Sequence, residues 1–497
     1  MFNSLTAGRA LKTYCDAFQR GAMEEFSDLF AEDAIFDLPL HDGRIIGRPA
    51  ILDEIRAALL GLRNIKVVIE HAIDDGSQCF AEGLLQAEHV GLPPHVDGKP
   101  MRLDFRFVAS VTVANGKVTR WSEYFDTKPL KPIERTHLYP ISRRSPYWDG
   151  TVAAGVSEFM VYNHTYFPLI FQHSPAEEYV ALTERVTLWD VGCERQTEIR
   201  GPDALRLAQY LTTRDLSSFK VGECKYTLAC DPQGQIICDP VLIHPRKDLI
   251  WLSHGDADLT LWAQGIAMHG GFDVEVSEPD VWPLQVQGPK ALDMLRGMVA
   301  APLDDLGFYK CELTKVNGVD AVVSRTGWSG GAGYEIFPSS SARAMELWNA
   351  LIEAGRPYGL MVTGPNISRA VEKGVTDTAY YSNSDMNPFE AGHGRLVDLD
   401  KGKFIGRETL ARIKDEGAKR KTIGLLIDGD LPHFEWYWPM RDSKGRAGEV
   451  RWAAYSFALK CYIGIAVADV GFERDDKVEI QHPAGVSRAT VTTVPFV

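Results

Sequence analysis

The sequence predicts a multidomain α+β protein: a small unit with helices packed on a curved sheet, then a larger unit of short strands and interspersed helices. Three observations support this prediction. The chain has 497 residues, more than one hydrophobic core usually serves, so two to four domains are expected. Its composition, 45% hydrophobic and 24% charged, is ordinary for a folded protein. Near residue 150 the pattern changes from helices followed by long strands to short strands interrupted by Gly and Pro.

Charge, hydropathy and cysteine usage narrow the class of protein. The formal net charge is −14, whereas a nucleic-acid partner requires basic surface. No apolar run reaches the roughly 18 residues of a membrane span, and the first residues do not have the pattern of a signal peptide. The eight cysteines form no Cys-x-x-Cys pair and no cluster with histidine. We therefore expect a cytoplasmic protein with reduced thiols, no metal site and no membrane or nucleic-acid partner.

Residues 1–128 are expected to form the first domain. Apolar residues at helical spacing predict two helices on either side of Arg20-Gly21 and a third over residues 49–62, with the run Ala34–Leu38 and a turn at Asp42-Gly43 between them. Asn115-Gly116 is typical of a two-residue hairpin turn. Longer strands are expected at residues 65–71, 78–89, 101–114 and 118–125.

Composition divides the rest of the chain into three parts. Residues 129–150 are rich in Pro and Arg and are expected to be a partly extended linker. Residues 151–420 should form the main domain, and the strand-rich residues 421–497 a separate β domain. Helices are expected at residues 176–186, 202–212, 256–268, 288–299, 340–354, 364–374 and 406–416.

The segment Asp231–Pro240 places a carboxylate at the end of a tight hairpin. Asp231-Pro-Gln-Gly234 has the composition of a β-turn, and residues 235–238 return as a strand. Asp239 then precedes Pro240, which cannot donate to a sheet. A desolvated carboxylate is costly unless it meets a ligand or a partner. Asp239 is therefore a candidate for contacting a ring nitrogen or an amine, and a turn-capping aspartate is the alternative.

The segment Arg325–Phe337 places a second carboxylate after a glycine-rich turn. Four glycines between residues 327 and 333 allow the main chain to approach a flat ligand closely. Glu335 follows on the next strand, where a carboxylate can accept two N–H bonds from an aminopyrimidine edge. The ring of Trp328, inside the loop, suits a sulfonium ion or a stacked methoxy-aromatic group. The alternative is a plain hairpin with an exposed glutamate.

Several ordered motifs over residues 155–497 resemble those of the glycine-cleavage T-protein (aminomethyltransferase) superfamily. They are Val161–Pro168, Leu188–Gln196, Ile199–Ala204, Leu284–Lys290 and Asn387–Gly392. Within the superfamily the chain is most similar to dimethylsulfoniopropionate demethylases, through Trp189–Gln196, Arg214–Ser217 and Asp239–Val241. The resemblance implies a three-lobed, ring-like fold with a C-terminal lobe of β-barrel type, and tetrahydrofolate as the cofactor.

The resemblance also implies roles for single positions. Asp239 matches the acid near the reactive nitrogens of the folate, and Glu335 matches the acid that holds the pterin edge. Arg369 and Glu372 match a helix end near the folate, and Glu390 matches the glutamate of a Pro-x-Glu turn. Trp328 and Tyr334 are further cofactor-binding candidates. The candidate substrate-binding residues are Tyr162, Asn163, His164, Tyr380 and Tyr381, and the candidate catalytic residues are Asp239, Tyr162 and Tyr381.

One segment departs from the family pattern. Between Glu372 and Glu390 the family shows an aromatic-Gly-Asn-Asp segment, whereas this chain has Thr378-Ala-Tyr-Tyr381. Asn383 and Asp385 lie nearby but out of register. The substrate pocket is therefore expected to differ from those of the relatives. The tyrosine pair favours a methoxy-aromatic donor, because a phenolate leaving group needs a proton.

The N-terminal region resembles the SnoaL-like (NTF2-like) superfamily through Arg20–Ala34, Arg44–Ile51 and Gly116–Asp126. This resemblance implies a cone-shaped α+β domain with an interior pocket. Arg102 and Asp104 face the same side of a strand and, with Glu123, would form an acid–Arg–acid set similar to that of limonene epoxide hydrolases. The alternatives are a mutually satisfied polar network or a dimer interface. A homodimer through this domain is expected from the habits of the superfamily.

We therefore expect a tetrahydrofolate-dependent demethylase that transfers a methyl group from a small sulfonium or methoxy-aromatic molecule to N5 of tetrahydrofolate. Three alternatives remain open. One is an aminomethyltransferase of glycine cleavage. Another is the folate domain of an amine-oxidising flavoenzyme, which would need a Gly-x-Gly-x-x-Gly fingerprint that residues 1–150 do not contain. The third is a non-catalytic folate-binding or RNA-modification helper, which the net charge disfavours.

Overall fold

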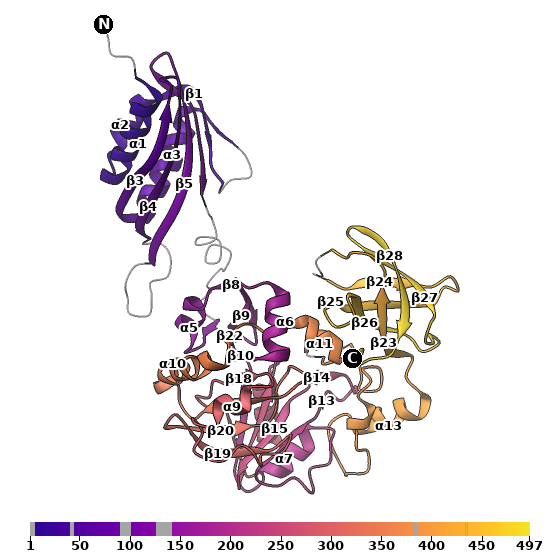
Figure 1. The fold of residues 1–497 in the computed structure, drawn as a ribbon. Helices are drawn as coiled ribbons and strands as arrows, with labels where there is room; N and C mark the ends of the chain where they lie inside the picture. Colours follow the sequence, from indigo (N-terminus) through magenta and orange to yellow (C-terminus); the bar gives the residue numbers. More distant parts are fainter. Residues whose placement is uncertain are drawn as a thin grey trace. The chain divides into compact units, whose positions relative to one another are not determined.

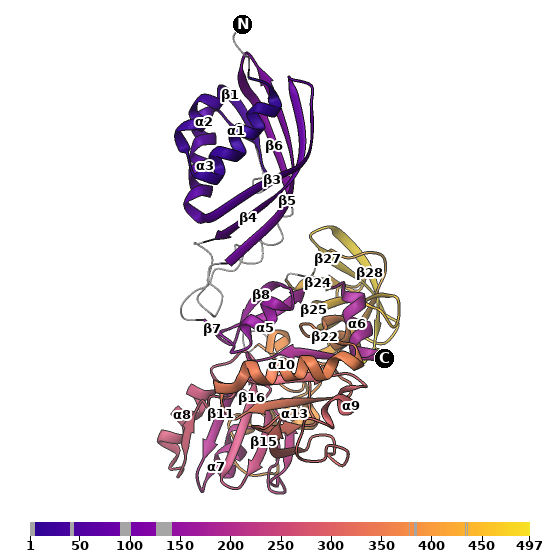
Figure 2. The same cartoon turned by 60° about the vertical axis from the view of Figure 1, so that its left-hand side comes forward.

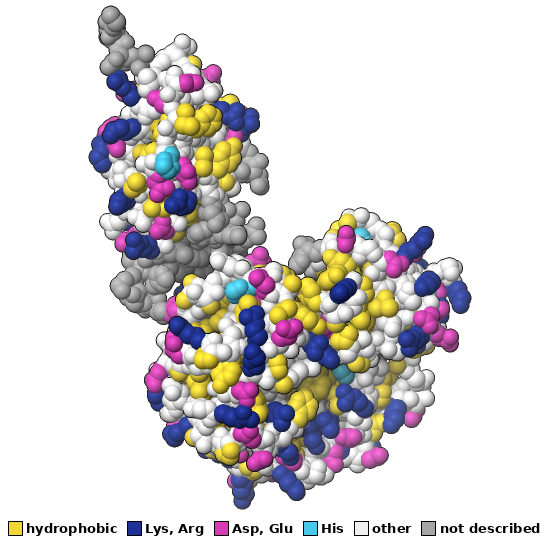
Figure 3. Space-filling model, viewed as in Figure 1, with side chains coloured by type: hydrophobic (Ala, Val, Ile, Leu, Met, Phe, Trp, Pro, Cys, Tyr) yellow, Lys and Arg dark blue, Asp and Glu magenta, His cyan; other side chains and the backbone are white. Residues whose placement is uncertain are grey.

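The computed structural model describes residues 5–39, 44–89, 101–125, 142–376, 378–381, 385–432, 434 and 436–497. The chain folds into two compact units, Met1–His137 and Leu138–Val497. Within the described ranges no helix is long and apolar enough to cross a membrane. Basic and acidic side chains are interspersed on the face drawn in Figure 3, so no continuous basic stripe crosses that face.

The first unit packs three helices on one face of a curved sheet with the strand order β2-β1-β6-β5-β4-β3 (Figures 1 and 2). The helices are α1 (Ala7–Arg20), α2 (Met23–Leu29) and α3 (Arg48–Gly61). The strands are β1 (Phe30–Asp37), β2 (Ile45–Ile46), β3 (Leu62–Asp74), β4 (Gln78–His89), β5 (Met101–Ala114) and β6 (Lys117–Phe125). The α+β fold expected for this region is confirmed. The pair β1–β6 is parallel, because the intervening chain crosses the sheet before β6 returns beside β1.

Local sequence explains where these elements begin and end. The Thr6 hydroxyl caps α1 by accepting a hydrogen bond from the backbone N–H of Arg9 at 3.3 Å. Gly21 ends the helix with a left-handed φ of 66°. Asn115 and Gly116 have φ values of 51° and 70°, as a two-residue hairpin turn between β5 and β6 requires.

Strand β5 shows which face of the first sheet packs on the helices. Leu103, Phe105 and Phe107 are buried, whereas the alternating Arg102 and Asp104 are exposed. The apolar set faces inward, so the outward face carries the charges. The expected acid–Arg–acid set is therefore wrong: Arg102 and Asp104 lie on the opposite face of β5 from the interior of the unit.

The second unit contains two larger sheets with several helices around them (Figure 1). One has the order β19-β20-β21-β18-β10-β22 and the other β12-β15-β16-β11-β17. The strands of the first are β10 (Val186–Asp190), β18 (Leu284–Gln287), β19 (Cys311–Val316), β20 (Val319–Ser324), β21 (Gly333–Pro338) and β22 (Leu360–Val362). The strands of the second are β11 (Arg195–Arg200), β12 (Glu223–Tyr226), β15 (Val241–Arg246), β16 (Leu249–His254) and β17 (Glu275–Ser277).

Smaller elements complete this part of the unit. Strands β7 (Arg143–Arg144), β8 (Val156–Tyr162) and β9 (Thr165–Phe171) form one small sheet, and β13 (Ala229–Cys230) pairs with β14 (Ile236–Cys238). Residues 143–150, assigned to the linker from sequence, form β7 and the start of α5 (Trp148–Ala153). The other helices are α6 (Pro175–Glu184), α7 (Ala204–Leu211), α8 (Leu259–Gly270), α9 (Ala291–Leu295), α10 (Ala344–Gly355), α11 (Ile367–Lys373), α12 (Thr378–Tyr381) and α13 (Arg407–Glu416).

The C-terminal strands close into a barrel in the order β23-β26-β25-β24-β27-β28 (Figure 1). They are β23 (Arg420–Ile427), β24 (Trp438–Arg441), β25 (Ala447–Ser456), β26 (Cys461–Asp469), β27 (Lys477–His482) and β28 (Gly485–Thr492). Alternate residues of these strands fill the interior; Leu425, Val450 and Ile480 are fully buried there. The expected β-barrel lobe is confirmed.

All eight cysteines are free thiols. Seven are buried, and Cys461 on β26 is partly exposed. Burial raises the pKa of Cys461 and of Cys193. These thiols are therefore mostly protonated at neutral pH and pack as small apolar groups.

Candidate active site

Glu335 lies in the middle of a sheet, between two strands that supply its partners. On β21 it stands opposite Gln285 of β18 and Ser324 of β20. The Gln285 side-chain amide donates to Glu335 Oε1 at 2.8 Å, and the Thr326 hydroxyl donates to Oε2. Glu335 is 8% exposed, and burial raises its pKa while the two hydrogen bonds act to lower it. The carboxylate is thus fixed in orientation by neutral donors.

This geometry leaves Glu335 able to accept further hydrogen bonds. Each carboxylate oxygen can accept about two, and among the described residues each oxygen receives one side-chain donor. Neither donor is a Lys or Arg, so the charge is not neutralised by an ion pair there. Two parallel N–H groups of a flat heterocycle would satisfy the remaining lone pairs.

The glycine-rich loop that precedes Glu335 packs directly on Gln287 of β18. A Cβ atom at Gly327, whose φ is 154°, or at Gly333 would overlap the Gln287 side-chain amide. The Ser329 hydroxyl donates to Gln287 Oε1 at 2.6 Å, and Gln287 Nε2 donates to the carbonyl of Thr326 at 3.3 Å. These contacts hold the loop close against Gln287, in the segment that leads to Glu335.

Trp328, within the same loop, packs edge-to-face against Trp452 of the barrel strand β25, with ring centroids 5.8 Å apart. Its backbone N–H lies 3.4 Å from Gln285 Oε1. The two tryptophans come from segments more than a hundred residues apart. They therefore bring the barrel against the glycine-rich loop that precedes Glu335.

Asp239 lies between β14 and β15 at one end of a chain of hydroxyl groups. Tyr226 donates to Asp239 Oδ2 at 2.9 Å, and its hydroxyl lies 3.4 Å from that of Tyr381. The Tyr381 hydroxyl lies 2.8 Å from His393 Nε2 and 2.7 Å from Thr376 Oγ1. Asp239 and Tyr381 are thus brought together, although 155 residues separate Tyr226 from Tyr381 in sequence.

Electrostatics fix the protonation states along this chain of groups. Burial and then the charge of Asp239 raise the pKa values of Tyr226 and Tyr381 well above the ordinary 10. Burial, with the nearby charge of Arg395, lowers the pKa of His393 to about 4. At neutral pH both tyrosines are therefore protonated and His393 is neutral. Both tyrosine hydroxyls are weak acids, so neither readily gives up its proton.

Tyr309 connects the surroundings of Glu335 and Asp239. Its pKa is raised to about 12, by burial first and then by the charge of Glu335, whereas Arg214 acts to lower it. Arg214 in turn donates to the backbone carbonyl of Tyr226 at 3.1 Å. The two acidic segments thus share neighbours within the second unit.

The structure gives Asn163 and His164 a turn-forming role. They link β8 to β9 with φ values of 52° and 58°, the conformation of a tight hairpin turn. The buried Asn163 amide donates to the carbonyl of His254 at 3.2 Å, and its Oδ1 has no partner among the described residues. His164 is exposed, and its ring lies 3.5 Å from Asp258. Tyr162 packs near Phe167, with ring centroids 6.2 Å apart.

Three other expected site residues also have structural partners. Tyr334 is buried in the core on the opposite face of β21 from Glu335, so it does not share that site. Tyr380 is fully buried and its hydroxyl lies 2.8 Å from Thr422 Oγ1 of the barrel. Arg369 donates to Glu372 at 3.3 Å and lies over the ring of Tyr179.

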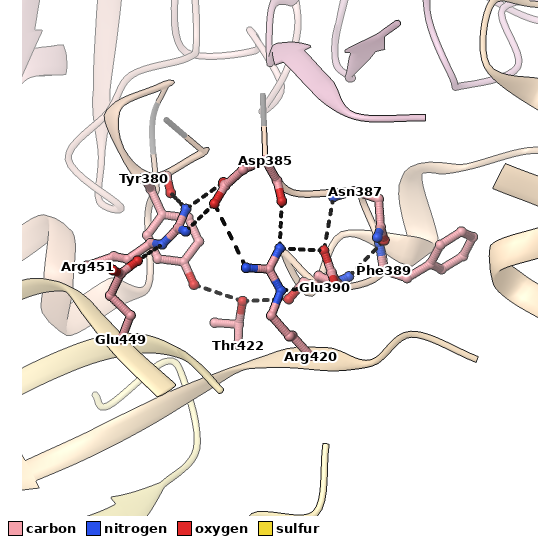
Figure 4. Close-up of polar contacts among 9 residues, drawn as sticks. All are labelled: Tyr380, Asp385, Asn387, Phe389, Glu390, Arg420, Thr422, Glu449 and Arg451. Carbon is pink, nitrogen blue, oxygen red and sulfur yellow. Dashed lines mark hydrogen bonds and ion pairs between the residues drawn. The ribbon is translucent and has the colours of Figure 1, made fainter. Parts of the chain in front are cut away.

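Figure 4 shows how charged residues fasten the segment around Tyr380 to the barrel. Arg451 of β25, 3% exposed, contacts Asp385 with both guanidinium nitrogens at 2.9 and 2.6 Å and donates to the Tyr380 carbonyl at 3.1 Å. Arg420 of β23 holds Glu390 through two bonds of 3.1 Å. The segment that departs from the family pattern is therefore built into the fold through its own ion pairs.

Sequence reasoning missed three direct partners of the two acids, Gln285, Thr326 and Tyr226, and three residues next to them, Gln287, Thr376 and His393. Gln285 and Gln287 stand in the Leu284–Lys290 motif, and their alternate spacing on one strand gave a usable signal, since it places both on one face. Tyr226 and His393 gave none, because only the tertiary fold brings their segments together.

Comparison with known proteins matches the chain in three stretches. Residues 149–401 match the GCVT N-terminal domain, residues 420–497 the glycine cleavage T-protein C-terminal barrel domain, and residues 11–121 a SnoaL-like domain. The dimethylsulfoniopropionate demethylase DmdA of Ruegeria pomeroyi is 35% identical over 350 residues, covering 70% of this chain and 96% of that protein. An aminomethyltransferase of Moorella thermoacetica is 31% identical over 364 residues, covering 71% and 97%.

A solved structure shows the same fold in the second unit. The glycine cleavage system aminomethyltransferase T of Bartonella henselae superposes with a TM-score of 0.65 at 20% identity, covering 71% of this chain and 98% of that one. The sequence matches to these two relatives and the structural match cover nearly the same share of the chain, 70–71%. The chain therefore belongs to the glycine-cleavage T-protein (aminomethyltransferase) family, preceded by a SnoaL-like domain, and is a folate-dependent methyltransferase of that family.

Proposed function

We propose that this chain is a demethylase that transfers a methyl group from a small sulfonium molecule to N5 of tetrahydrofolate. The observation that carries the proposal is the Glu335 carboxylate, fixed by Gln285 and Thr326 after a glycine-rich loop that packs on Gln287. It fits the pterin edge of a folate, which offers parallel N–H donors. The 35% identity to a dimethylsulfoniopropionate demethylase supports the choice of donor.

The residues of the chain act mainly by positioning. When bound, tetrahydrofolate supplies N5, the nucleophile that accepts the methyl group. Glu335 would fix the pterin edge, and the loop around Trp328 would exclude water from it. Asp239, oriented by the Tyr226 hydroxyl at 2.9 Å, would face the reactive nitrogens and accept the proton that N5 loses as it gains the methyl group. Because methyl displacement requires in-line alignment, holding both reactants accounts for much of the rate.

The protonation states around Tyr381 favour a sulfonium donor over a methoxy-aromatic one. A phenolate leaving group needs a proton, but burial and Asp239 raise the pKa values of Tyr226 and Tyr381, which makes both poor acids. Tyr380 is fully buried and bonded toward Thr422. A sulfonium ion leaves as a neutral sulfide and needs no proton, so this environment suits it. The aromatic surface of Trp328 would also attract its positive charge.

The test is to incubate the full chain with tetrahydrofolate and separate donors, and to measure 5-methyltetrahydrofolate by chromatography. Dimethylsulfoniopropionate should give product, whereas a methoxybenzoate should give much less. Absence of methylated folate with every sulfonium, betaine and methoxy-aromatic donor contradicts the proposal. Asp239→Asn should lower the rate by roughly 100-fold or more, as expected when an oriented catalytic carboxylate is neutralised.

Tyr381→Phe separates the two donor classes. With a sulfonium donor the variant should keep its rate within about threefold of the wild type, because no proton is delivered. If Tyr381 instead protonates a phenolate, the variant should lose roughly 100-fold or more with the methoxy-aromatic donor. Tyr455→Phe, on a partly exposed barrel residue, is the control for removing a hydroxyl elsewhere.

Aminomethyl transfer is the second candidate function, because aminomethyltransferases of 31–33% identity cover nearly all of their own length with this chain. That activity would release ammonia and form 5,10-methylenetetrahydrofolate from an aminomethylated carrier protein. Product analysis separates the two functions directly, since methylene- and methyltetrahydrofolate differ in mass and oxidation state.

A further inference from the structure

The first unit encloses a cavity of about 330 Å³ between its helices and the inner face of its sheet. Its volume lies in the range of small-molecule sites. Rings from both the helices and the sheet line it: Tyr14, Phe18, Phe36, Phe105, Phe107 and Phe125. Such a concentration of aromatic faces favours apolar groups and cations.

Two carboxylates, Glu54 of α3 and Glu123 of β6, also line the cavity. Among the described residues that line it there is no Lys, Arg or His. The Trp121 indole donates to Glu123 Oε1 at 3.0 Å, and the described residues offer this carboxylate no other hydrogen bond. Burial raises the pKa of Glu123 to about 7, and no positive side chain acts to lower it. Glu123 retains some accessible surface because it borders the cavity.

The described arginines of strands β5 and β6 are directed away from the cavity. Arg102 and Arg106 lie on the outward face of β5, and Arg106 pairs there with Glu70 and Glu82. Arg120 of β6 donates to Asp37 at 3.1 Å. The negative charge of ionised Glu123 is therefore not balanced by these side chains, and a bound cation would balance it.

We propose that this cavity binds a small organic cation with apolar substituents, such as a quaternary ammonium or tertiary sulfonium ion. Its charge would face Glu123 and Glu54, and its alkyl or aryl groups would contact the rings. The lining selects this class over others: two carboxylates repel an anion, and an apolar wall supplies too few oxygen atoms for a metal ion. A primary ammonium needs three acceptors, whereas an onium ion needs none.

The charge state of Glu123 predicts how binding depends on pH. Glu123 must be ionised to attract the cation, so affinity should fall as the pH drops below about 7. The other titratable groups facing it are Tyr14 and Cys15 of α1 and Glu54 of α3. Burial raises the pKa of the Cys15 thiol to about 12 and that of Tyr14 well above its ordinary value, so both stay neutral in this range.

The experiment compares choline with 3,3-dimethylbutan-1-ol, its uncharged carbon isostere, by isothermal titration calorimetry on the full chain at pH 8. Choline should bind at least tenfold more tightly than the alcohol. Glu123→Gln, which keeps an acceptor for the Trp121 indole, should weaken choline binding at least tenfold and leave the alcohol unchanged. Equal affinities of the two probes for the wild type would overturn the proposal.

Two further variants place the site and guard against misfolding. Asp104→Asn removes a charge from the outward face of β5 and should leave choline binding unchanged; an equal loss in this variant would contradict binding in the cavity. Glu54→Gln should weaken binding by roughly threefold, as a partly screened charge would. If neither glutamate variant changes the affinity while circular dichroism shows native folding, the proposal is wrong. None of these outcomes depends on the demethylase activity.

Discussion

Glu123 in the first unit and Glu335 in the second are carboxylates of the same kind in different settings. Burial raises the pKa of each. Glu335 has a neutral donor on each oxygen and a rigid loop beside it. Glu123 has one indole donor and an aromatic cavity. A fixed carboxylate recognises the shape of a donor set, whereas a loosely held one in an apolar cavity recognises charge.

Glu372 extends the comparison to a fully satisfied acid. It is completely buried and accepts from Tyr179, Arg369 and Ser456 side chains and from the backbone N–H of Ala458. These donors come from α6, α11 and the end of the barrel strand β25. An acid with this many partners stabilises the fold and has no lone pair directed at a ligand.

The largest effect is expected for Glu372→Ala. Four donors, including the Arg369 guanidinium, lose their acceptor, so the free energy of unfolding should fall by about 3–5 kcal/mol. Urea denaturation followed by circular dichroism measures it. Glu416→Ala, at an exposed helix position, should change stability by no more than about 0.5 kcal/mol. If Glu372→Ala lowers the free energy of unfolding no more than Glu416→Ala does, the hydrogen bonds to Glu372 do not stabilise the fold.

Next in size is the pH dependence that Glu123 gives to the first unit. Its folded pKa of about 7 exceeds the ordinary 4.5, so the folded state binds a proton more tightly than the unfolded state. Its stabilising contribution is full below pH 4.5 and is lost as the pH rises through 7, by at most about 3 kcal/mol. Amide exchange in β6, corrected for intrinsic rates, should show this slope in the wild type and not in Glu123→Gln.

Glu335→Gln should act on folate binding rather than on the fold. Loss of a charged acceptor costs about 1.5–3 kcal/mol, so the Kd for tetrahydrofolate should rise roughly 10- to 100-fold. Glu312→Gln, on the exposed face of β19, is the matched control and should bind normally. Because burial raises the pKa of Glu335, wild-type affinity should also fall on the acid side as that carboxyl protonates. Unchanged affinity in Glu335→Gln would remove this residue from the folate site.

The smallest effect separates two glycines of the same loop. Gly327→Ala places a methyl group against the Gln287 amide at a φ of 154°, and should cost about 1–3 kcal/mol of stability and weaken folate binding. Gly331→Ala meets only Ser329 Oγ at 3.6 Å and should be nearly neutral. Thermal unfolding of the two variants makes the comparison. Equal melting temperatures would mean that the loop is not held against Gln287.

The sequence predicted the elements of the first unit closely, because period-two apolar patterns and the Asn115-Gly116 turn specify strands and a hairpin locally. It misplaced Arg102 and Asp104. Period two shows that they share a face but does not by itself show which face is inside. The apolar Leu103, Phe105 and Phe107 show which face of β5 is inside, because all three are buried. The resemblance to the charged set of limonene epoxide hydrolases had predicted the opposite face.

At the candidate site the sequence predicted the two acids because tight turns and glycines mark them locally. Tyr226 and His393 were not predicted, since they meet the predicted Tyr381 only after the strands, the short helix α12 and the barrel are assembled. Asn163 stays a predicted substrate-binding residue; the structure adds that it also forms the left-handed turn between β8 and β9.

The partly exposed thiol of Cys461 gives this protein a native attachment point for a spectroscopic probe. Cys461 pairs across a hairpin with Ser456, whose hydroxyl donates to Glu372 at 2.6 Å. The other seven cysteines are buried, so a maleimide dye or spin label would attach at one position without mutagenesis. Since burial raises the pKa of this thiol, labelling would proceed best at mildly alkaline pH. The attached probe would report, from the edge of the barrel, on whether the contacts around Glu372 tighten when folate binds.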